Sequence, residues 1–141
     1  MTEAHDPAAV VQRQLDAYNA RDLDAIVAVY APDAQQFEHP GKLAASGADQ
    51  IRERMAQRFQ EPDLYAHLLQ RVVMGKLVID QELLTRNFPE GIGTVDVIAI
   101  YEVEGDKIRS ATVQVSNKQL RPQPVNPGLS GSANNVASRG E

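Results

Sequence analysis

Apolar side chains recur every three or four residues over the first sixty positions, a spacing that places them along one side of an α-helix. A helix start is expected at Asp6, because an aspartate directly before a proline is typical of a helix N-terminus. A second helix begins after Asp22 and must end before Pro32, since proline cannot continue the hydrogen-bonded turn. A third helix is predicted between Ser46–Gly47 and Pro62.

From about residue 65 the pattern changes to long segments in which apolar and polar residues alternate. Alternation with a period of two is typical of strands, and glycine-containing turns between the segments indicate antiparallel hairpins. A shorter polar strand is expected to end at Glu38-His39-Pro40-Gly41. Helices followed by an antiparallel sheet predict an α+β fold with the helices on one face of the sheet. The four long predicted strands are Tyr65–Met74, Lys76–Phe88, Thr94–Val103 and Lys107–Ser116.

The composition is that of a globular protein, and it narrows the class of partner. The chain has 141 residues, of which 43% are hydrophobic and 23% charged, and its formal net charge is −5. This acidity argues against nucleic acid, whose binding depends on clustered lysine and arginine, and no window is apolar enough to span a membrane. Without cysteine the chain offers no disulfide and no thiolate metal ligand. We therefore expect a cytoplasmic protein that binds neither nucleic acid nor membrane.

One domain is predicted over residues 1–120. Residues 121–141 are rich in Pro, Gly, Ser and Asn and contain few large apolar side chains. Such a composition buries too little surface to offset the entropy that is lost on ordering. We interpret this segment as a flexible polar tail, with a strand or a cover over a pocket as the alternative.

Three segments carry a resemblance to a known superfamily: DLDAIVAVYAPDAQQFEHPG at residues 22–41, SGADQIRERM at 46–55 and IAIYEVEGDKI at 98–108. Over about residues 8–118 the chain resembles the nuclear transport factor 2-like superfamily, in particular its SnoaL-like polyketide cyclase and ketosteroid isomerase-like branches. The resemblance implies a cone-shaped fold, in which three N-terminal helices pack on a strongly curved, mostly antiparallel sheet around a closed apolar pocket. It also implies homodimers through the outer face of the sheet.

Matching of single positions argues against ordinary ketosteroid isomerase activity. In that branch the general base is an aspartate near the end of the first strand, just before a proline, and His39 takes this position here. The tyrosine and the protonated aspartate that stabilise the oxyanion in that branch would fall near Gln14 and Ala99, which are not acidic donors. We therefore do not expect ketosteroid isomerisation by that route.

His39 is the candidate catalytic residue. A neutral imidazole in a pocket accepts a proton near pH 7, and a protonated imidazole donates a hydrogen bond to a ligand carbonyl. Alternatively, the ring caps the strand end and bonds to nearby backbone. Strand alternation turns Glu38 to the opposite face, as a surface or interface carboxylate, unless a bulge before Pro40 reverses the two.

Polar residues inside the predicted strands leave alternatives open. Asp96 is expected to face outward at a subunit interface, although the opposite register would place it in the pocket. Asp80, Glu82 and Arg86 share one strand face, where they could bind the polar end of a ligand. The favoured interpretation of these three is a solvated or interfacial row of ion pairs. Tyr101 could donate its hydroxyl to a ligand or lie in the core with the hydroxyl at the rim.

These observations predict a small-molecule enzyme that uses acid–base chemistry on an apolar or amphipathic carbonyl compound, as an isomerase, cyclase or dehydratase. The alternative is a non-catalytic ligand-binding or dimeric interaction domain of the same fold. No metal or organic cofactor is predicted, because the histidines at positions 5, 39 and 67 lack metal-ligand spacing. Besides His39, the residues predicted to contact the substrate are Gln14, Tyr18, Tyr30, Phe37, Met55, Phe59, Val97, Ala99, Tyr101 and Val113.

Overall fold

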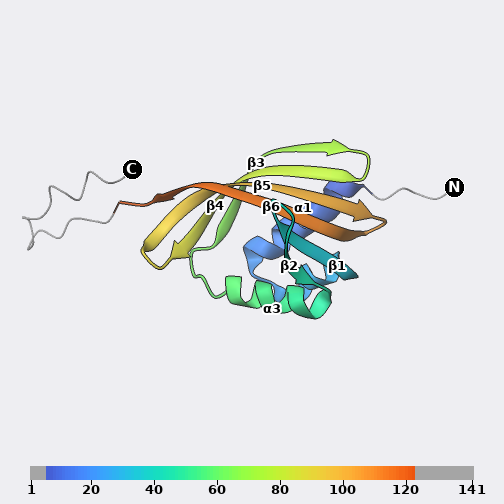
Figure 1. Ribbon diagram of the computed structural model, residues 1–141, viewed down its shortest axis with the longest axis horizontal. Helices are drawn as coiled ribbons and strands as arrows, with labels where there is room; N and C mark the ends of the chain where they lie inside the picture. The colour runs from blue at the N-terminus through green and yellow to red at the C-terminus, as the bar shows by residue number, and fades with distance from the viewer. Residues whose placement is uncertain (1–5, 123–141) are drawn as a thin grey trace, which may run out of the picture.

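The structure, a computed structural model, describes residues 6–122 of the chain. Within these residues it contains three helices and six strands, which Figure 1 shows in chain order from blue to red. The long strands β4, β5 and β6 run above α3 in this view. The helices are α1 (Pro7–Ala20), α2 (Leu23–Val29) and α3 (Ala48–Arg58), and the strands are β1 (Tyr30–Glu38), β2 (Lys42–Ser46), β3 (Tyr65–Met74), β4 (Leu77–Phe88), β5 (Gly91–Glu104) and β6 (Lys107–Leu120).

The six strands form one mixed sheet in the order β2-β1-β6-β5-β4-β3. Neighbouring strands are antiparallel except β1 and β6, which run parallel. Helix α1 packs against β3, β4, β5 and β6, whereas α3 packs against β1 and β2. The predicted α+β class and the mostly antiparallel sheet are therefore confirmed.

Strand β2 was not predicted. β2 pairs antiparallel with β1, and the register shifts between Gln36 and Phe37. Its five residues, KLAAS, contain too little alternation to indicate a strand. Gln36 pairs with Ala45 and Phe37 with Leu43, so the extra residue, Ala44, lies in β2 and β1 keeps its own alternation. That alternation buries Gln36 together with Ala34.

Side-chain caps confirm the predicted starts of α1 and α2, whereas α3 begins after Gly47 without such a cap. Asp6 Oδ1 accepts a hydrogen bond from the Ala8 backbone N–H at 3.0 Å, and Asp22 Oδ1 accepts one from the Ala25 N–H at 3.1 Å. Such caps satisfy backbone donors that the helix itself leaves without a partner. They fix where α1 and α2 begin.

The corner between α1 and α2 is hydrogen-bonded to edge strand β3 and to the segment just before it. The Asn19 side chain donates to Ala66 O at 2.9 Å and accepts from Ala66 N at 2.8 Å, so it pairs with β3 much as a strand would. Arg21 takes the left-handed conformation, with φ of 53°, and its guanidinium donates to the backbone oxygens of Leu64 and Pro62. These contacts hold α1 in place along the sheet.

The register of β5 agrees with the favoured prediction. Val95 and Val97 are buried, and Asp96 between them is exposed on the outer face, where Asn117 Nδ2 donates to its Oδ2 at 3.0 Å. The interface role of Asp96 stays a prediction. The predicted tail at 121–141 lies outside the described residues apart from Arg121 and Pro122, which follow β6 directly.

The favoured interpretation of Asp80 and Glu82 is wrong. Both face the interior, with Asp80 0% and Glu82 7% exposed. Strand pairing places Arg71 of β3 opposite Asp80, and its Nε and Nη2 donate to the two carboxylate oxygens at 2.7 Å and 2.9 Å. Arg71 Nη1 also donates to Gln12 Oε1 on α1 at 2.9 Å. Burial of Asp80 is tolerated because its partner is supplied by the next strand.

Candidate functional site

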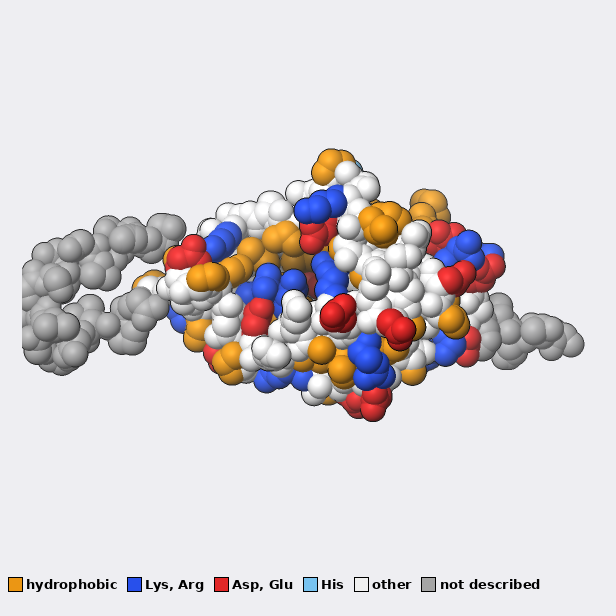
Figure 2. All heavy atoms as spheres, turned by 60° about the horizontal axis from the view of Figure 1, so that its bottom comes forward, with side chains coloured by type: hydrophobic (Ala, Val, Ile, Leu, Met, Phe, Trp, Pro, Cys, Tyr) orange, Lys and Arg blue, Asp and Glu red, His pale blue; other side chains and the backbone are white. Residues whose placement is uncertain are grey.

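A cavity of about 420 Å³ opens between α1, α3 and the inner face of the sheet. Figure 2 shows a hollow in the surface, with hydrophobic side chains inside it and Lys and Arg side chains around it. The volume is within the range of small-molecule sites. The fold therefore provides room for a ligand at the place where the long strands meet the helices.

All residues predicted to form the site line this cavity except Phe59. The Phe59 ring packs edge-to-face on Tyr18, with the ring centroids 5.7 Å apart. Phe59 therefore supports a wall residue without contacting the cavity. The roles assigned to the other residues stay predictions. Those that line the cavity are His39, Gln14, Tyr18, Tyr30, Phe37, Met55, Val97, Ala99, Tyr101 and Val113.

His39 lies at the opening of the cavity and is exposed. Its backbone N–H donates to Val113 O at 2.8 Å, which fixes the end of β1 on β6. Glu38 also lines the cavity, and its carboxylate is 3.5 Å from Arg54 Nη2. Alternation in β1 places Glu38 on the same side as the buried Ala34 and Gln36, so the prediction that it faces away from the pocket is wrong.

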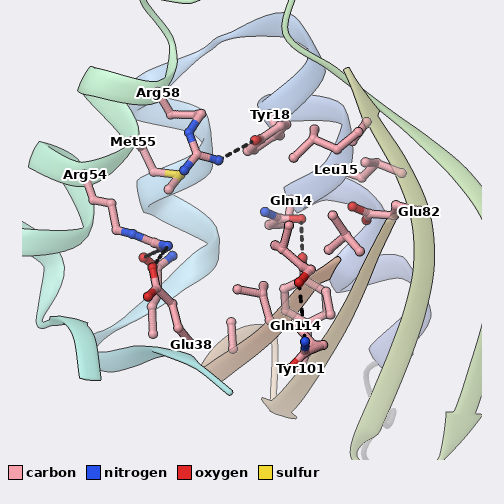
Figure 3. Close-up of a pocket in the computed structure, with 18 of the residues that line it drawn as sticks. Gln14, Leu15, Tyr18, Glu38, Arg54, Met55, Arg58, Glu82, Tyr101 and Gln114 are labelled. Atoms are coloured by element: carbon pink, nitrogen blue, oxygen red, sulfur yellow. Dashed lines mark hydrogen bonds and ion pairs between the residues drawn. The ribbon is translucent and has the colours of Figure 1, made fainter. Parts of the chain in front are cut away.

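Glu82 is the most buried carboxyl group in the cavity wall, and Figure 3 shows it pointing inward from β4 on the side of Gln14 and Leu15. Among residues 6–122 it has no hydrogen-bond or ion-pair partner. Burial, and then the charge of Asp80, raise the pKa of Glu82 to about 7, against a smaller opposing effect of Arg71. Its carboxyl group is therefore about half ionised near neutral pH.

The alternation in β4 had already placed Glu82 and Arg86 on one face of the strand. The alternation pattern could not show that this face points into the interior, because charged residues are seldom fully buried.

A hydrogen-bonded pair of polar side chains lies in the wall next to Glu82. The Tyr101 hydroxyl donates to Gln14 Oε1 at 3.2 Å, and both side chains are buried. The Gln14 amide also lies next to the Tyr30 hydroxyl, and a hydrogen bond between the two opposes the effect of burial on the pKa of Tyr30. Burial raises the pKa of Tyr101 well above its usual value and that of Tyr30 to about 12, so both hydroxyls stay protonated. The cavity therefore contains neutral hydrogen-bond donors. Tyr101 does not take the position of the protonated aspartate of ketosteroid isomerases, which falls near Ala99; it is the next inward-facing residue of β5.

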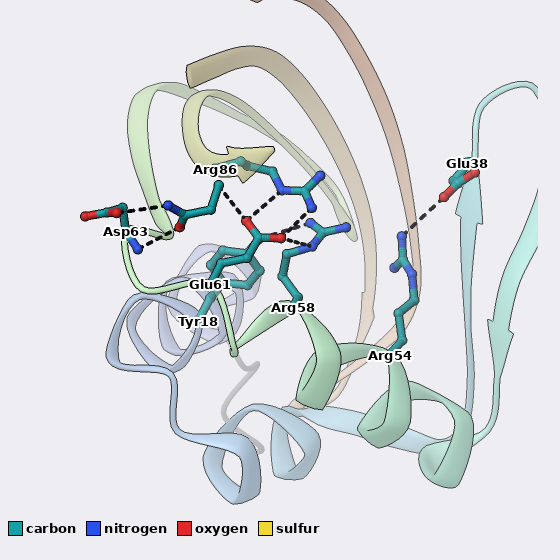
Figure 4. A network of polar contacts seen from close by, with 8 residues as sticks. Tyr18, Glu38, Arg54, Arg58, Glu61, Asp63 and Arg86 are labelled. Carbon is teal, nitrogen blue, oxygen red and sulfur yellow. Dashed lines mark hydrogen bonds and ion pairs between the residues drawn. The ribbon is translucent and has the colours of Figure 1, made fainter. Parts of the chain in front are cut away.

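The wall is not the apolar lining that the resemblance implied. Arg54 and Arg58 of α3 and Arg86 of β4 all line the cavity. Figure 4 shows the guanidinium groups of Arg58 and Arg86 next to each other, both directed at the carboxylate of Glu61, which follows α3. Arg86 donates to both carboxylate oxygens of Glu61, and the Asn87 N–H donates to one of them at 3.0 Å. The cavity is amphipathic, because its wall combines apolar side chains with a few buried polar ones and its mouth is cationic.

No helix within residues 6–122 is long and apolar enough to cross a membrane. Across the same range, no group of three or more His, Cys, Asp or Glu side chains could hold a metal ion.

A mixed six-stranded sheet with three helices and a cavity between the two layers is the arrangement of the nuclear transport factor 2-like α+β fold. The model of the SnoaL-like domain family matches residues 11–111. The chain therefore belongs to the SnoaL-like domain family, as its sequence resemblance had indicated.

Solved structures agree with this assignment. A cystatin-fold protein from Novosphingobium aromaticivorans is 26% identical, covers 77% of this chain and 97% of its own, and superposes with a TM-score of 0.72. A candidate polyketide cyclase from Sinorhizobium meliloti is 21% identical, covers 78% and 100%, and has a TM-score of 0.65. IdmH, a candidate polyketide cyclase from Streptomyces antibioticus, is 17% identical, covers 79% and 92%, and has a TM-score of 0.67. The last two proteins are less than 25% identical to this chain, so their similarity shows a shared fold only.

The Glu82→Gln variant should change how stability depends on pH. Because the pKa of Glu82 is raised from 4.5 to about 7, the folded chain holds a proton between these pH values that the unfolded chain has lost. Wild-type stability therefore falls as pH rises through this window. We expect Glu82→Gln to be more stable than wild type by about 2–3 kcal/mol at pH 8 and by far less at pH 4.5.

Urea unfolding at both pH values measures the difference. Glu53→Gln, at an exposed position of α3, is the matched control and should differ from wild type by less than about 0.5 kcal/mol at either pH. A Glu82→Gln gain that is the same at both pH values would contradict the assignment.

Proposed function

We propose that the protein binds a small amphipathic carbonyl compound in this cavity and moves a proton on it, as an isomerase, cyclase or dehydratase. The observation that carries the proposal is the Glu82 carboxyl group, which faces the cavity and has no partner among residues 6–122. A carboxyl group that is half ionised near neutral pH can both take up and return a proton. Membership of the SnoaL-like family supports a small-molecule role. The cysteine-free composition favours a cytoplasmic setting.

In the proposed reaction, ionised Glu82 removes a proton from the carbon next to the substrate carbonyl. The electron pair of that C–H bond moves into the adjacent C–C bond, and negative charge collects on the carbonyl oxygen. Gln14 Nε2 donates a hydrogen bond to this oxygen, while the Tyr101 hydroxyl keeps the Gln14 amide oriented. In a substrate with a C=C bond next to that carbon, the charge extends over a dienolate, and protonated Glu82 returns the proton to its far carbon while the double bond shifts, which completes an isomerisation. If the enolate carbon instead attacks a second carbonyl, Glu82 protonates the new alkoxide, and a ring is formed.

The donor set favours a particular kind of substrate. A neutral amide stabilises an enolate less than the acidic donors of ketosteroid isomerases do, because it carries less positive charge at the hydrogen. The carbon acid must then be more acidic than a simple ketone. Compounds with two carbonyl groups on one carbon meet this condition, and we expect substrates of that type.

A non-catalytic ligand-binding domain is the alternative function. This alternative is favoured because Gln14 and Ala99 provide no acidic hydrogen-bond donor at the positions where ketosteroid isomerases have one. In that case Glu82 and Gln14 would serve only to hydrogen-bond the ligand.

Exchange of substrate protons with D2O separates these alternatives. A panel of cyclic β-keto esters with one α-hydrogen is incubated with the protein, and loss of the α-proton signal is followed by NMR. We expect Glu82→Gln to reduce the protein-dependent exchange rate by about 100-fold or more, the usual size of a general-base effect. His39→Gln should stay within about threefold of wild type, because His39 is exposed at the opening.

The opposite ranking, with exchange lost in His39→Gln and kept in Glu82→Gln, would restore His39 as the base. A bound ester that exchanges no faster than in buffer would favour the non-catalytic alternative.

A homodimer through the outer face of the sheet is also part of the proposal. Val72, Ile79 and Ile100 are neighbours in register across β3, β4 and β5. Val72 is 48% and Ile100 38% exposed, and Ile100 alternates with the buried residues of β5. A contiguous exposed row of apolar side chains is typical of a protein interface.

We expect Ile100→Glu to convert the protein to a monomer in sedimentation velocity at about 10 μM, because a charge at an apolar interface is left without a partner. Gln57→Glu, which adds the same charge on exposed α3, should leave the sedimentation coefficient unchanged. A wild-type monomer at this concentration would contradict the dimer.

A further inference from the structure

The mouth of the cavity concentrates positive charge in a chain that is acidic overall. The side chains of Arg54, Arg58 and Arg86 all line the cavity and are 24%, 24% and 25% exposed. The net charge of the whole sequence is −5. These three guanidinium groups, which we call the arginine mouth, therefore differ in sign from the protein around them.

Two carboxylates lie close to the arginine mouth. Glu61 binds Arg86 through both oxygens, and its Oε2 is 3.8 Å from Arg58 Nε (Figure 4). Glu38 is 3.5 Å from Arg54 Nη2 and its side chain is 48% exposed. Three positive charges thus face two negative ones, and Arg58 is the arginine that lacks a close carboxylate of its own.

The positive charges act on one another. Burial, and next the charge of Arg58, lower the pKa of Arg54, against the opposing effect of Glu38. Like charges held this close in a partly buried place repel each other, because water screens them incompletely. An added negative charge at the mouth would relieve this repulsion.

Donor groups for such a charge are available. Arg58 Nη1 donates to the Tyr18 hydroxyl at 3.4 Å, and Arg86 uses Nε and Nη2 on Glu61. Arg58 Nη2 and Arg86 Nη1 have no acceptor among residues 6–122. A guanidinium group has five N–H donors in a fixed plane, so these free donors suit the planar oxygens of a carboxylate.

A purely structural role explains Arg86 but not Arg58. The bidentate Arg86–Glu61 pair and the Asn87 N–H are enough to hold the segment after α3 against β4. Arg58 adds only the longer contacts to Glu61 and Tyr18. Its position at the mouth is therefore the feature that calls for a ligand.

We propose that the arginine mouth binds a carboxylate group of the substrate between Arg58 and Arg86, while the carbonyl end of the same molecule enters the cavity toward Glu82. This inference rests on the proposed function for the reaction at Glu82. Glu82 and Arg86 lie on one face of β4 and are four residues apart, so their backbones are separated by about 13 Å. The substrate is then an elongated keto acid with a single negative charge, which matches the excess of one positive charge at the mouth.

The test compares two ligands of equal size. The probes are 6-oxo-6-phenylhexanoate and its neutral primary amide, and their affinities are measured by NMR titration of the full chain. At about 50 mM salt the carboxylate should bind wild type at least about tenfold more tightly than the amide, and this ratio should shrink at about 500 mM salt. Arg58→Gln should lower carboxylate affinity about tenfold and leave amide affinity within about twofold.

Control variants separate charge, geometry and folding. Arg52→Gln removes an arginine from the exposed face of α3 and should change neither affinity. Arg58→Lys keeps the charge without the planar donor pair and should give an intermediate carboxylate affinity, which also serves if Arg58→Gln folds poorly. Glu82→Gln should keep the carboxylate preference, because it alters only the reacting end.

The outcomes distinguish this inference from the proposed reaction. Equal wild-type affinities for the two probes would overturn the carboxylate site even if proton exchange depends on Glu82. A carboxylate preference that needs Arg58, without any proton exchange, would support the site and contradict the proposed reaction. No binding of the carboxylate up to about 10 mM would also overturn the site.

Discussion

Two carboxyl groups face inward from β4, and the neighbouring strand provides one arginine for them. Arg71 binds both oxygens of Asp80, whereas Glu82, two residues further on, has no partner among residues 6–122. An ionised carboxylate without a partner is costly in a poorly hydrated place, and the charge of Asp80 adds to that cost. Glu82 therefore holds its proton to unusually high pH. The proposed chemistry depends on this unequal supply of partners.

Spacing along β4 keeps the two ends of the cavity chemically different. Leu84 is buried between Glu82 and Arg86 on the inner face, so the guanidinium group bonds to Glu61 instead of the buried carboxyl group. If Arg86 reached Glu82, the carboxylate would be stabilised and its pKa would fall. Charge recognition at the mouth and proton transfer further inside can thus occur in one small cavity. The neutral Gln14–Tyr101 pair adds hydrogen-bond donors without adding charge.

The outline of the fold was predictable from local patterns, and the decisive part of the site was not. Period-two alternation indicated the strand that carries Glu82, and it placed Asp96 on the correct face of β5. It could not show that Arg71 would lie opposite Asp80, because strand register depends on contacts between distant segments. Without that pairing, a carboxylate is expected to face solvent.

The prediction around His39 had a similar limit. Matching by position placed it at the end of the first strand, which is where the structure has it. The end of β1 pairs with β6 on one side and with β2 on the other, and β2 leaves no clear mark in the sequence. Irregular pairing of this kind is decided by packing, so sequence patterns located the cavity more closely than the chemistry within it.

The most direct test of this account is the titration of Glu82 itself. Protein labelled with ¹³C at the glutamate side-chain carboxyl is followed by NMR from pH 4 to pH 9, and the Glu82 signal is assigned by its loss in Glu82→Gln. The account predicts a titration midpoint for Glu82 near 7, well above the ordinary glutamate value of about 4.3. A Glu82 midpoint at or below that ordinary value would mean that the carboxyl group has a partner or is well hydrated, and it would contradict the account.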